Sequence, residues 1–473
     1  MTRTGAPRIT PEAIVSAGLC IGCGVCTARG PFDGHMRWDR YGQLKPDRNV
    51  HDAAGHADFA AVCPFSPAAP NEDHIAAVRF PSAAEHHPLL GRFDAAYVGH
   101  VTEGDYRANG SSGGMATWVA AELLRLGLVD GIAHVVRSEQ PGDPRFSYRI
   151  SRCLEDLRRG AKSRYYPVHL GEVLHEIRLR PGRYAIVGIP CFIKAAQNLR
   201  LQDPILAERI AFTLGLFCGH MKSTRLVDSF AWQLNVDPAA VRDVDYRLKD
   251  PRKPANWYTA RLTLDEGRHV SGAWWDFADG DWGAGFFQNA ACNFCDDVVA
   301  ETADIAFGDA WLEPYSQDGR GTNVVIVRMP AIRAIVEAAN EDGRLALRRV
   351  DAEFVAATQA AGFRHRREGL AYRLTWRRRQ RRTRVEPRTR VAPSAKGLTL
   401  RRRLLYRARA SISAWSHRIA LFAARIHAPQ VYIRWAAIAL AGYQALAHSR
   451  GRLGRLVDAA ERSGARRPTA RWR

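Results

Sequence analysis

The stretch GLCIGCGVC, residues 18–26, contains the pattern that decides how the chain is organised. Its cysteines, Cys20, Cys23 and Cys26, follow one another at C-x2-C-x2-C spacing, and Cys63 stands downstream in front of a proline. A cubane iron–sulfur cluster binds thiolates at several corners of a small box, and a Cys-Pro pair can supply the last of them. The spacing therefore predicts a 4Fe–4S centre held by these four cysteines.

The glycines of this stretch and the place of the fourth cysteine bear on the same prediction. Gly22 and Gly24 permit the tight backbone that brings three sulfurs to one side of a cluster. The chain departs from the usual ferredoxin spacing, because 36 residues separate Cys26 from Cys63 where such runs have three. A zinc site with four cysteine ligands is the alternative, although its usual signature is two C-x2-C pairs.

The distribution of residue types divides the chain into three parts. Residues 1–80 are rich in Gly, Pro and Cys, which suits a small domain held by a metal centre. From 90 to 345, after a linker at 86–88, predicted strands alternate with predicted helices, which favours an α/β core with a mixed, mostly parallel sheet. The strands are expected at 95–101, 131–137, 183–189, 209–217, 303–308 and 323–328, and the helices at 115–126, 192–199 and 224–233. Residues 346–473 form a basic, largely helical C-terminal extension.

Composition excludes some classes of protein. Of the 473 residues, 46% are apolar and 25% are charged, which is ordinary for globular proteins and argues against disorder. The net charge is +21, but residues 361–473 hold 29 Lys and Arg against 4 Asp and Glu, so the rest is close to neutral. The basic pI is therefore no argument that the whole chain binds nucleic acid. No signal peptide and no apolar run of about 18 residues is evident, so we expect a cytoplasmic chain.

The basic extension has several interpretations. WRRRQRRTR, residues 376–384, is a dense basic run, and residues 400–447 interleave Trp415, Tyr432 and Trp435 with Leu, Ile and Arg. Interfacial amphipathic helices have this composition, so residues 376–447 are predicted to contact an anionic membrane surface or a protein partner. A solvated helix is the alternative, and nucleic acid is disfavoured because no binding motif accompanies the charge. We expect truncation after Val350 to leave the redox centres intact.

A second set of cysteines lies in the α/β part. Cys191 and Cys218 each follow a predicted strand, and the carboxyl ends of parallel strands share one edge of a sheet. Cys292 and Cys295 form a C-x2-C pair. Together the four could ligate a second cluster; two buried core thiols plus a zinc half-site or redox pair is the alternative. Cys153 is left over and is expected to be structural.

A glycine-rich loop precedes the first helix of the α/β part. Asn109, Ser111, Ser112, Gly113 and Gly114 lead into the helix expected from residue 115. Glycines let backbone N–H groups approach a phosphate, the helix N-terminus adds partial positive charge, and a serine can cap it. The loop is therefore a candidate pyrophosphate cradle, and a plain glycine-rich turn is the alternative. It also satisfies G-x-S-x-G, but no strand leads directly into it as a hydrolase elbow requires.

Several motifs together resemble one family. They are GLCIGCGVC, NGSSGGMATWVAAELL, GAKSRYYPV, GIPCFIKAAQNL, LGLFCGH, VDYRLKD, CNFCDDVVAETADIAFGDAWL and NVVIVR. They stand in the order seen in the coenzyme F420 hydrogenase/dehydrogenase beta-subunit family, over about residues 18 to 330. The resemblance implies a ferredoxin-like N-terminal domain, a flavin-binding core with parts at about 90–172 and 180–345, FAD on the glycine-rich loop, and a cluster on the second cysteine set. It also implies a flavin-contacting element, Lys162, Ser163, Arg164 and Tyr165, in which Arg164 stands where Lys is usual.

The resemblance implies an oxidoreductase that passes electrons between two 4Fe–4S clusters, FAD and a two-electron partner. That partner is coenzyme F420, or an organic substrate reduced with ferredoxin electrons. A ferredoxin-like or other redox protein is the expected partner, with the inner membrane face as a peripheral location. The alternative is a zinc-stabilised, non-enzymatic binding module with a basic tail. The sequence assigns no catalytic acid or base.

Overall fold

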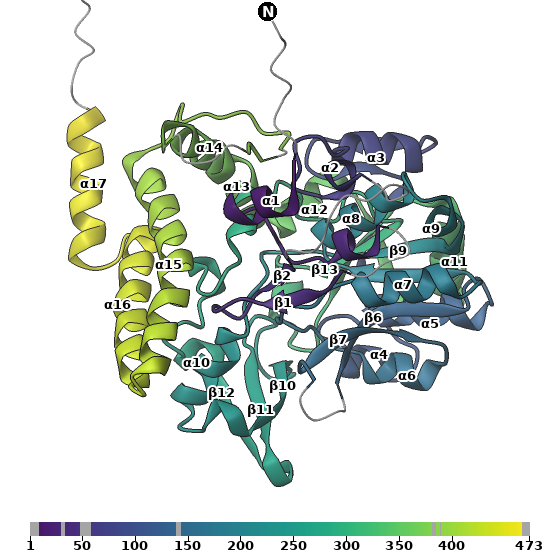
Figure 1. Ribbon diagram of the computed structural model, residues 1–473, viewed down its shortest axis with the longest axis horizontal. Helices are drawn as coiled ribbons and strands as arrows, with labels where there is room; N and C mark the ends of the chain where they lie inside the picture. The colour runs from purple at the N-terminus through teal and green to yellow at the C-terminus, as the bar shows by residue number, and fades with distance from the viewer. Residues whose placement is uncertain are drawn as a thin grey trace, which may run out of the picture.

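An eight-stranded sheet forms the centre of the computed structural model, which describes residues 9–29, 34–47, 58–138, 143–380, 385–387 and 389–465. The strand order is β15-β5-β14-β13-β9-β8-β6-β7. The strands are β5 (Ala95–Val101), β6 (Gly131–Arg137), β7 (Phe146–Ser151), β8 (Tyr184–Gly188), β9 (Ile210–Leu216), β13 (Ile305–Asp309), β14 (Asn323–Val327) and β15 (Leu345–Val350). Figure 1 shows helices on both faces of this sheet.

The sheet is mixed, as predicted. Strands β13, β9, β8 and β6 form a parallel block, and antiparallel neighbours flank it on both sides. Five of the eight strands run in one direction, although four of the seven neighbouring pairs are antiparallel. The sequence NVVIV of β14 is buried throughout, as expected for β-branched residues in the middle of a covered sheet.

Helices from the α/β part cover the two faces. The first of them are α4 (Tyr106–Asn109), α5 (Met115–Arg125), α6 (Leu154–Arg159), α7 (Gly171–Leu179), α8 (Pro190–Arg200), α9 (Pro204–Arg209), α10 (Arg225–Gln233) and α11 (Pro330–Glu341). Helices α5 and α11 share one buried cluster with β5, β13 and β14, and α7 and α8 pack on the other face. All predicted strands and helices of this part are found within two residues of their expected ends.

A small antiparallel sheet was not predicted. It contains β10 (Val241–Leu248), β11 (Thr259–Leu264) and β12 (His269–Ala273), in that order. Its buried side chains, among them Tyr246 and Leu262, join the cluster that also contains α8 and α10. The small sheet therefore packs on the same side of the central sheet as α8 and α10.

The N-terminal segment lies against the face that carries α8. It contains α1 (Pro11–Ser16), the 3₁₀ helix η1 (Val25–Ala28), the hairpin β1 (Met36–Trp38) and β2 (Leu44–Pro46), α2 (Phe59–Val62) and α3 (Glu72–Arg79). Its buried side chains, such as Leu19 and Phe59, belong to the same cluster as Ile193 of α8. The linker expected at 86–88 is partly strand, because β3 (Glu85–His87) pairs with β4 (Gly91–Phe93).

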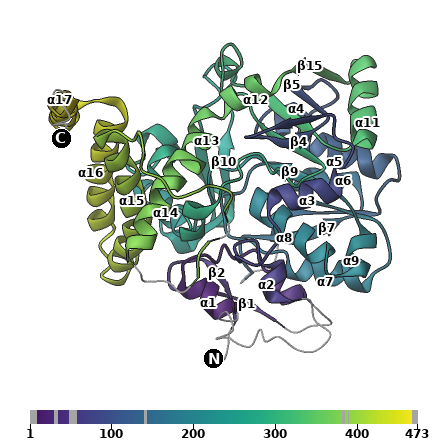
Figure 2. The same cartoon turned by 90° about the horizontal axis from the view of Figure 1, so that it is seen from above.

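The C-terminal extension is helical, as predicted, but it does not begin at residue 346. Strand β15 pairs with β5, so the central sheet continues to Val350. The helices that follow are α12 (Ala352–Thr358), α13 (Ala360–Arg366), α14 (Glu368–Gln380), α15 (Leu400–Arg425), α16 (Pro429–His448) and α17 (Gly451–Ala465). Helices α15 and α16 lie side by side at the end of the molecule away from α11 (Figures 1 and 2).

The extension packs on the core and is no detached tail. Tyr406 and His417 of α15 and Tyr432 of α16 are buried, and Tyr432 donates a hydrogen bond to Asp279 at 2.8 Å. The basic run 376–384 lies partly outside the described residues. Over the part of the chain that the structure describes, the helices fall short of the length and apolar character that a membrane crossing takes.

Candidate functional site

The first cysteine set is held by a tightly turned loop. Gly22 and Gly24 adopt left-handed conformations, with φ of 84° and 75°. A Cβ on Gly22 would stand 2.6 Å from the carbonyl oxygen of Leu44, and one on Gly24 would stand 2.8 Å from Cβ of His169. Both positions therefore require glycine for conformation and for space. Cys63 is the C-cap of α2, which faces this loop.

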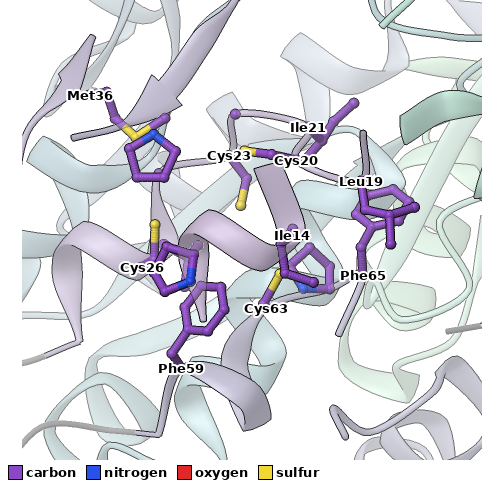
Figure 3. Close-up of a pocket in the computed structure, with 16 residues that line it drawn as sticks. Ile14, Leu19, Cys20, Ile21, Cys23, Cys26, Met36, Phe59, Cys63 and Phe65 are labelled. Carbon is purple, nitrogen blue, oxygen red and sulfur yellow. The ribbon is translucent and has the colours of Figure 1, made fainter. Parts of the chain in front are cut away.

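The four N-terminal cysteines surround one cavity (Figure 3). The side chains that close it are apolar, and they include Ile14, Leu19, Met36, Phe59 and Phe65. Among the described residues, those that line this cavity include no charged side chain, although Lys45 and Arg29 lie close by and donate to the carbonyls of Cys20 and Cys26 at 2.7 and 3.1 Å. The structure thus brings together the cysteines that the sequence predicts as ligands, in an apolar setting that favours a metal centre shielded from water.

The ionisation of these thiols is opposed by their surroundings. Burial raises the pKa of Cys63 to about 12, and burial together with the neighbouring cysteines raises the pKa of Cys23 and Cys26 far above the ordinary value. Thiolates in such a place require a nearby positive charge, which a metal centre provides. The four thiols would therefore ionise only with a metal centre inside the cavity that they surround.

The second cysteine set comes from three separate places in the α/β part. Cys191 lies in the first turn of α8, directly after β8, and Cys218 follows the adjacent parallel strand β9. Cys292 lies in the 3₁₀ helix η6 (Ala290–Phe294), and Cys295 follows it. One cavity is lined by all four cysteines together with Ile21, Phe65, Ile189, Pro190 and Arg366.

A backbone N–H and a cation lie close to the sulfurs of the second set. The Met221 N–H donates to Sγ of Cys292 at 3.3 Å. Burial raises the pKa of Cys218 and Cys295 to about 12, and the charge of Arg366 acts in the opposite direction on both. The second set therefore differs from the first in having a cation in the wall of its cavity.

The two cavities are neighbours. Ile21 and Phe65, both from the N-terminal segment, line each of them. Cys23 of the first set is close enough to Cys191 of the second to raise its pKa. Two apolar side chains thus form the partition between the two cysteine sets.

Over the described residues, no group of three or more His, Cys, Asp or Glu side chains converges on a point where one metal ion would sit. Both cysteine sets instead surround a space. Cys153 lies apart from them on the surface, where its Sγ donates to Asp156 at 3.2 Å. The leftover cysteine therefore lines neither cavity.

The glycine-rich loop lies at the start of α5 beside β14. Gly114 is the left-handed N-cap of α5, and the Met115 N–H donates to Oδ1 of Asn323 at 3.1 Å. The expectation that a serine caps this helix is wrong, because Ser112 Oγ donates instead to the carbonyl of Thr322 at 3.0 Å. Asn109 also points elsewhere, with its amide donating to Asp105.

Close packing rather than open space surrounds the glycines of this loop. A Cβ on Gly113 would meet Asn323 and the Gly99 carbonyl within 2.9 Å, and one on Gly114 would meet Tyr106 at 2.6 Å. These glycines are therefore required by the fold itself.

The second element expected to contact flavin adjoins the loop. The Ser163 N–H donates to Oγ of Ser111 at 2.7 Å, so residues 162–165 and the glycine-rich loop form one surface. Lys162 has a φ of 97° and lies 3.5 Å from the carboxylate of Asp245. Arg164 points away, donating to the carbonyls of Val244 and Ala161 beside the Phe146 ring.

Several cations lie near the glycine-rich loop. Lys249 Nζ donates to the Ser112 carbonyl at 3.1 Å and to the Arg320 carbonyl at 2.8 Å. Burial, together with Lys162, Arg107 and other nearby cations, lowers the pKa of Lys249 to about 8. Carboxylates offset much of this charge, because Lys162 pairs with Asp245 and Arg107 pairs with Asp318, and Lys249 Nζ holds the loop through three backbone carbonyls. An anionic group such as a pyrophosphate would meet cations near the loop that already have partners.

The predicted Tyr165 has neighbours that sequence reasoning missed as site residues, and so does the second cavity. Tyr165 lies in an aromatic group with Trp282, 4.7 Å between ring centroids, and His220 stacks on the same indole at 4.3 Å. Arg247 forms a bidentate pair with Asp309 at 3.1 Å for both bonds. Arg366 carries no local signal in the sequence, whereas His220 stands in the quoted motif LFCGH.

Comparison with known proteins gives consistent matches. Residues 96–175 match the family model for the N-terminal part of the coenzyme F420 hydrogenase/dehydrogenase beta subunit, and residues 182–353 match the model for the C-terminal part of the same protein. Together the two matches span more than half of the chain.

Individual relatives are more distant. The chain is 24% identical over 326 residues to a coenzyme F420-dependent sulfite reductase of Methanocaldococcus jannaschii, covering 66% of this chain. The chain spans 45% of the length of that relative. It is also similar to a chain of a xenon-derivatised F420-reducing [NiFe] hydrogenase complex from Methanosarcina barkeri. That similarity has a TM-score of 0.47 and 17% identity, and covers 62% of this chain and 96% of the other.

Proposed function

Because the chain belongs to the coenzyme F420 hydrogenase/dehydrogenase beta-subunit family, we propose that it is an iron–sulfur flavoprotein oxidoreductase. It would pass electrons between two 4Fe–4S clusters, FAD and a two-electron partner. That partner would be coenzyme F420, or an organic substrate reduced with ferredoxin electrons. The observation that carries the proposal is the pair of adjacent cavities, each lined by four cysteines.

The cysteines would hold the clusters in two groups. Those of the first cavity are Cys20, Cys23, Cys26 and Cys63, and those of the second are Cys191, Cys218, Cys292 and Cys295. When bound, the clusters supply one-electron transfer and the flavin supplies exchange between one and two electrons. Ile21 and Phe65 would separate the two clusters with apolar side chains. The two groups of cysteines would still lie close together.

The surface made by the glycine-rich loop and residues 162–165 would hold the flavin. Lys249 and Lys162 would place positive charge near its pyrophosphate, and the Ser163–Ser111 hydrogen bond fixes the two segments relative to each other. Tyr165 reaches from this surface to Trp282 and thence to His220, close to the second cysteine set. Aromatic side chains would therefore link the proposed flavin surface to the second cavity.

A zinc-stabilised binding module without enzymatic activity is the competing proposal. A single zinc ion takes ligands that converge at about 2.3 Å from one point. The cysteines instead line two spaces, and over the described residues none of the candidate groups suits one ion. This arrangement favours clusters over zinc.

We also propose two kinds of partner, a redox protein and an anionic membrane surface. A ferredoxin-like or other redox protein would exchange electrons with the N-terminal cavity. The outer faces of α15 and α16 carry exposed apolar side chains, Trp415, Phe422 and Ile438 among them, next to arginines. That combination supports peripheral contact with an anionic membrane surface.

The experiment that tests the proposal is the cofactor content of cysteine variants purified without oxygen. Cys23→Ser and Cys191→Ser should each lose about half of the iron, and Cys23→Ser should keep its flavin. Cys153→Ser is the matched control, because this cysteine lines neither cavity, and it should keep full iron. A colourless wild-type chain containing zinc, or unchanged iron in Cys23→Ser, would overturn the assignment.

The flavin site needs a variant that leaves the backbone of the glycine-rich loop intact. Gly113→Val would collide with Asn323 and Gly99, so loss of flavin in it would report a damaged loop. Lys162→Met removes charge beside the loop, and Lys162 pairs with the carboxylate of Asp245, which lies outside the loop. It should lower flavin content while leaving iron unchanged, whereas full flavin retention would place the flavin elsewhere.

A further inference from the structure

A buried guanidinium from the C-terminal helices forms part of the wall of the second cavity. Arg366, the last residue of α13, is 4% exposed and lines that cavity with the four cysteines. Its Nη2 donates to the carbonyl of Cys218 at 3.0 Å and to that of Gly219 at 2.7 Å. Its Nη1 is buried and has no hydrogen-bond partner over the described part of the chain.

We propose that Arg366 is a positioning residue for the second cluster, to which its unpartnered Nη1 and its charge are directed, and that it raises the reduction potential of that cluster. The inference rests on the proposed function, since it takes the four cysteines as cluster ligands. It adds to that function a residue that sets the potential of the inner cluster.

Burial without a partner is costly for a guanidinium group. An unpaired charge in a protein interior is strongly destabilising, so groups in this position normally have an anion beside them. No carboxylate lines the second cavity, where the polar side chains are the cysteines and Arg366 itself. The anion that suits Nη1 is therefore a cluster together with its thiolates.

The electrostatic relation between Arg366 and the cysteines points the same way. Burial alone would lower the pKa of Arg366, but Cys295, Cys218, Cys292 and Cys191 raise it above the ordinary value. In return Arg366 is the strongest influence that lowers the pKa of Cys218, Cys292 and Cys295. The guanidinium and the four sulfurs thus act on one another as one site.

Two other buried arginines nearby are already engaged. Arg373 Nε donates to the Asn293 carbonyl at 2.8 Å, and Arg409 Nη2 donates to Oε1 of Gln288 at 3.0 Å. These residues fasten the loop that carries the C-x2-C pair, and they do not line the cavity. Arg366 is the charged residue among the three that faces the sulfurs.

The consequence for reduction follows from charge. Reduction of a cluster adds one electron and therefore one negative charge, and a fixed cation beside it makes that addition more favourable. Arg366 lies in the wall of the second cavity, so reduction of the second cluster should be more favourable than it would be without this charge.

The test uses the full-length chain purified without oxygen, with Cys23→Ser as background so that only the second cluster is present. Iron is counted, and the midpoint potential is measured by reductive titration followed by electron paramagnetic resonance. In that background Arg366→Gln should shift the midpoint to more negative potential, and Arg366→Lys should give an intermediate value. Arg364→Gln, on the exposed side of the same helix, is the matched control and should change nothing.

The outcomes separate the inference from the proposed function. If the unsubstituted chain lacks two clusters' worth of iron, the proposed function fails. If iron is complete but the midpoint of Arg366→Gln equals that of Arg364→Gln, the role of Arg366 is overturned. Complete loss of iron in both Arg366→Gln and Arg366→Lys would also overturn it, because Arg366 would then be required for the site to form and not for setting its potential.

Discussion

The two cysteine sites are assembled in opposite ways. Three of the four cysteines of the N-terminal site stand within residues 18–26, and the side chains around them all come from residues 11–65. The second site draws Cys191 and Cys218 from adjacent strand ends, a pair from η6, and Arg366 from the C-terminal helices. A site of the first kind is encoded by spacing, whereas a site of the second kind exists only when distant parts of the chain have folded together.

The sites also differ in what surrounds the sulfurs. Apolar side chains close the first cavity, and the second adds a guanidinium. The sulfurs of the two sets therefore have different electrostatic surroundings within one molecule.

The largest expected effect comes from removing the C-terminal helices. Truncation after Val350 should eliminate about half of the iron, because it deletes Arg366 and the helices that cover the loop carrying Cys292 and Cys295. Iron content and the number of paramagnetic signals measure the effect. This reverses the expectation from sequence that the redox centres survive this truncation.

Truncation after His448 is the matched control, because it removes α17 and leaves α13 to α16 in place. It should keep both clusters. Two intact clusters in the shorter chain would break the comparison, since the second site would then not depend on the extension.

A buried ion pair between the two sites provides the next test. Lys194 of α8, three residues after Cys191, lies 2.9 Å from Glu72 of α3, and both side chains are 5% exposed. Lys194→Met should lower the free energy of unfolding by about 3 kcal/mol, because a buried carboxylate would lose its main partner. Urea unfolding followed by tryptophan fluorescence measures this.

The double variant Lys194→Met, Glu72→Gln sharpens the result. It should cost less than the sum of the single variants, since neither charge is then left alone. Additive costs would mean that the pair does not join α3 to α8.

Acid should weaken the contact between the N-terminal segment and the extension. His417 of α15 lies 3.3 Å from the Gln43 amide and 3.2 Å from the Gln288 carbonyl, and burial lowers its pKa to about 4. The folded state holds this imidazole neutral, whereas the unfolded chain binds a proton below about pH 6.5. The free energy of unfolding should therefore fall by about 2 kcal/mol between pH 6.5 and 5 on account of His417.

The matched reference is His134 in β6, whose pKa burial also lowers to about 4, away from both cavities. Substituting either histidine by Gln should flatten the acid slope to a similar degree. Iron loss in acid should change in His417→Gln and stay as in the unsubstituted chain in His134→Gln, because only His417 lies in the contact between the N-terminal segment and the extension. A His417→Gln slope equal to that of the unsubstituted chain would contradict the role of this contact.

The smallest effect concerns the outer face of the extension. Arg418 lies over the ring of Trp415, 5.1 Å from its centroid, and that tryptophan is 50% exposed. If this face contacts anionic lipid, Arg418→Gln should weaken binding to anionic vesicles by about 1 kcal/mol and leave both clusters intact. Arg268→Gln, exposed between β11 and β12, should bind as the unsubstituted chain does. Absence of vesicle binding by the full-length chain would favour a protein partner.

The sequence predicts the parts whose signals are local. The strands at 95–101 and 131–137 are found as expected, because continuous buried runs bounded by turns mark them. Cys20, Cys23 and Cys26 are recognisable from spacing alone. Cys191 and Cys218 could be placed together only by inferring that their strands are parallel neighbours, which the structure confirms.

Other features have no local signal. Arg366 looks like any residue of a basic stretch, and its importance comes from the packing of α13 over the end of β9. The burial of α15 was missed because arginines and aromatic residues at helical spacing suit a lipid surface and a protein core equally. Arg409 and His417 are buried against backbone carbonyls that cannot be identified before the fold is known.

The dependence of the second site on residue 366 has a consequence for biosynthesis. The cysteines of the first site leave the ribosome within the first 63 residues, whereas the wall of the second is incomplete until more than three quarters of the chain has been made. Helices α13 to α15 then cover the loop that carries Cys292 and Cys295. We therefore expect the inner cluster to be inserted after the first one and before the C-terminal helices pack over the loop. The two clusters would then be inserted in the order in which their ligands are translated, and the C-terminal helices would close the second cavity last.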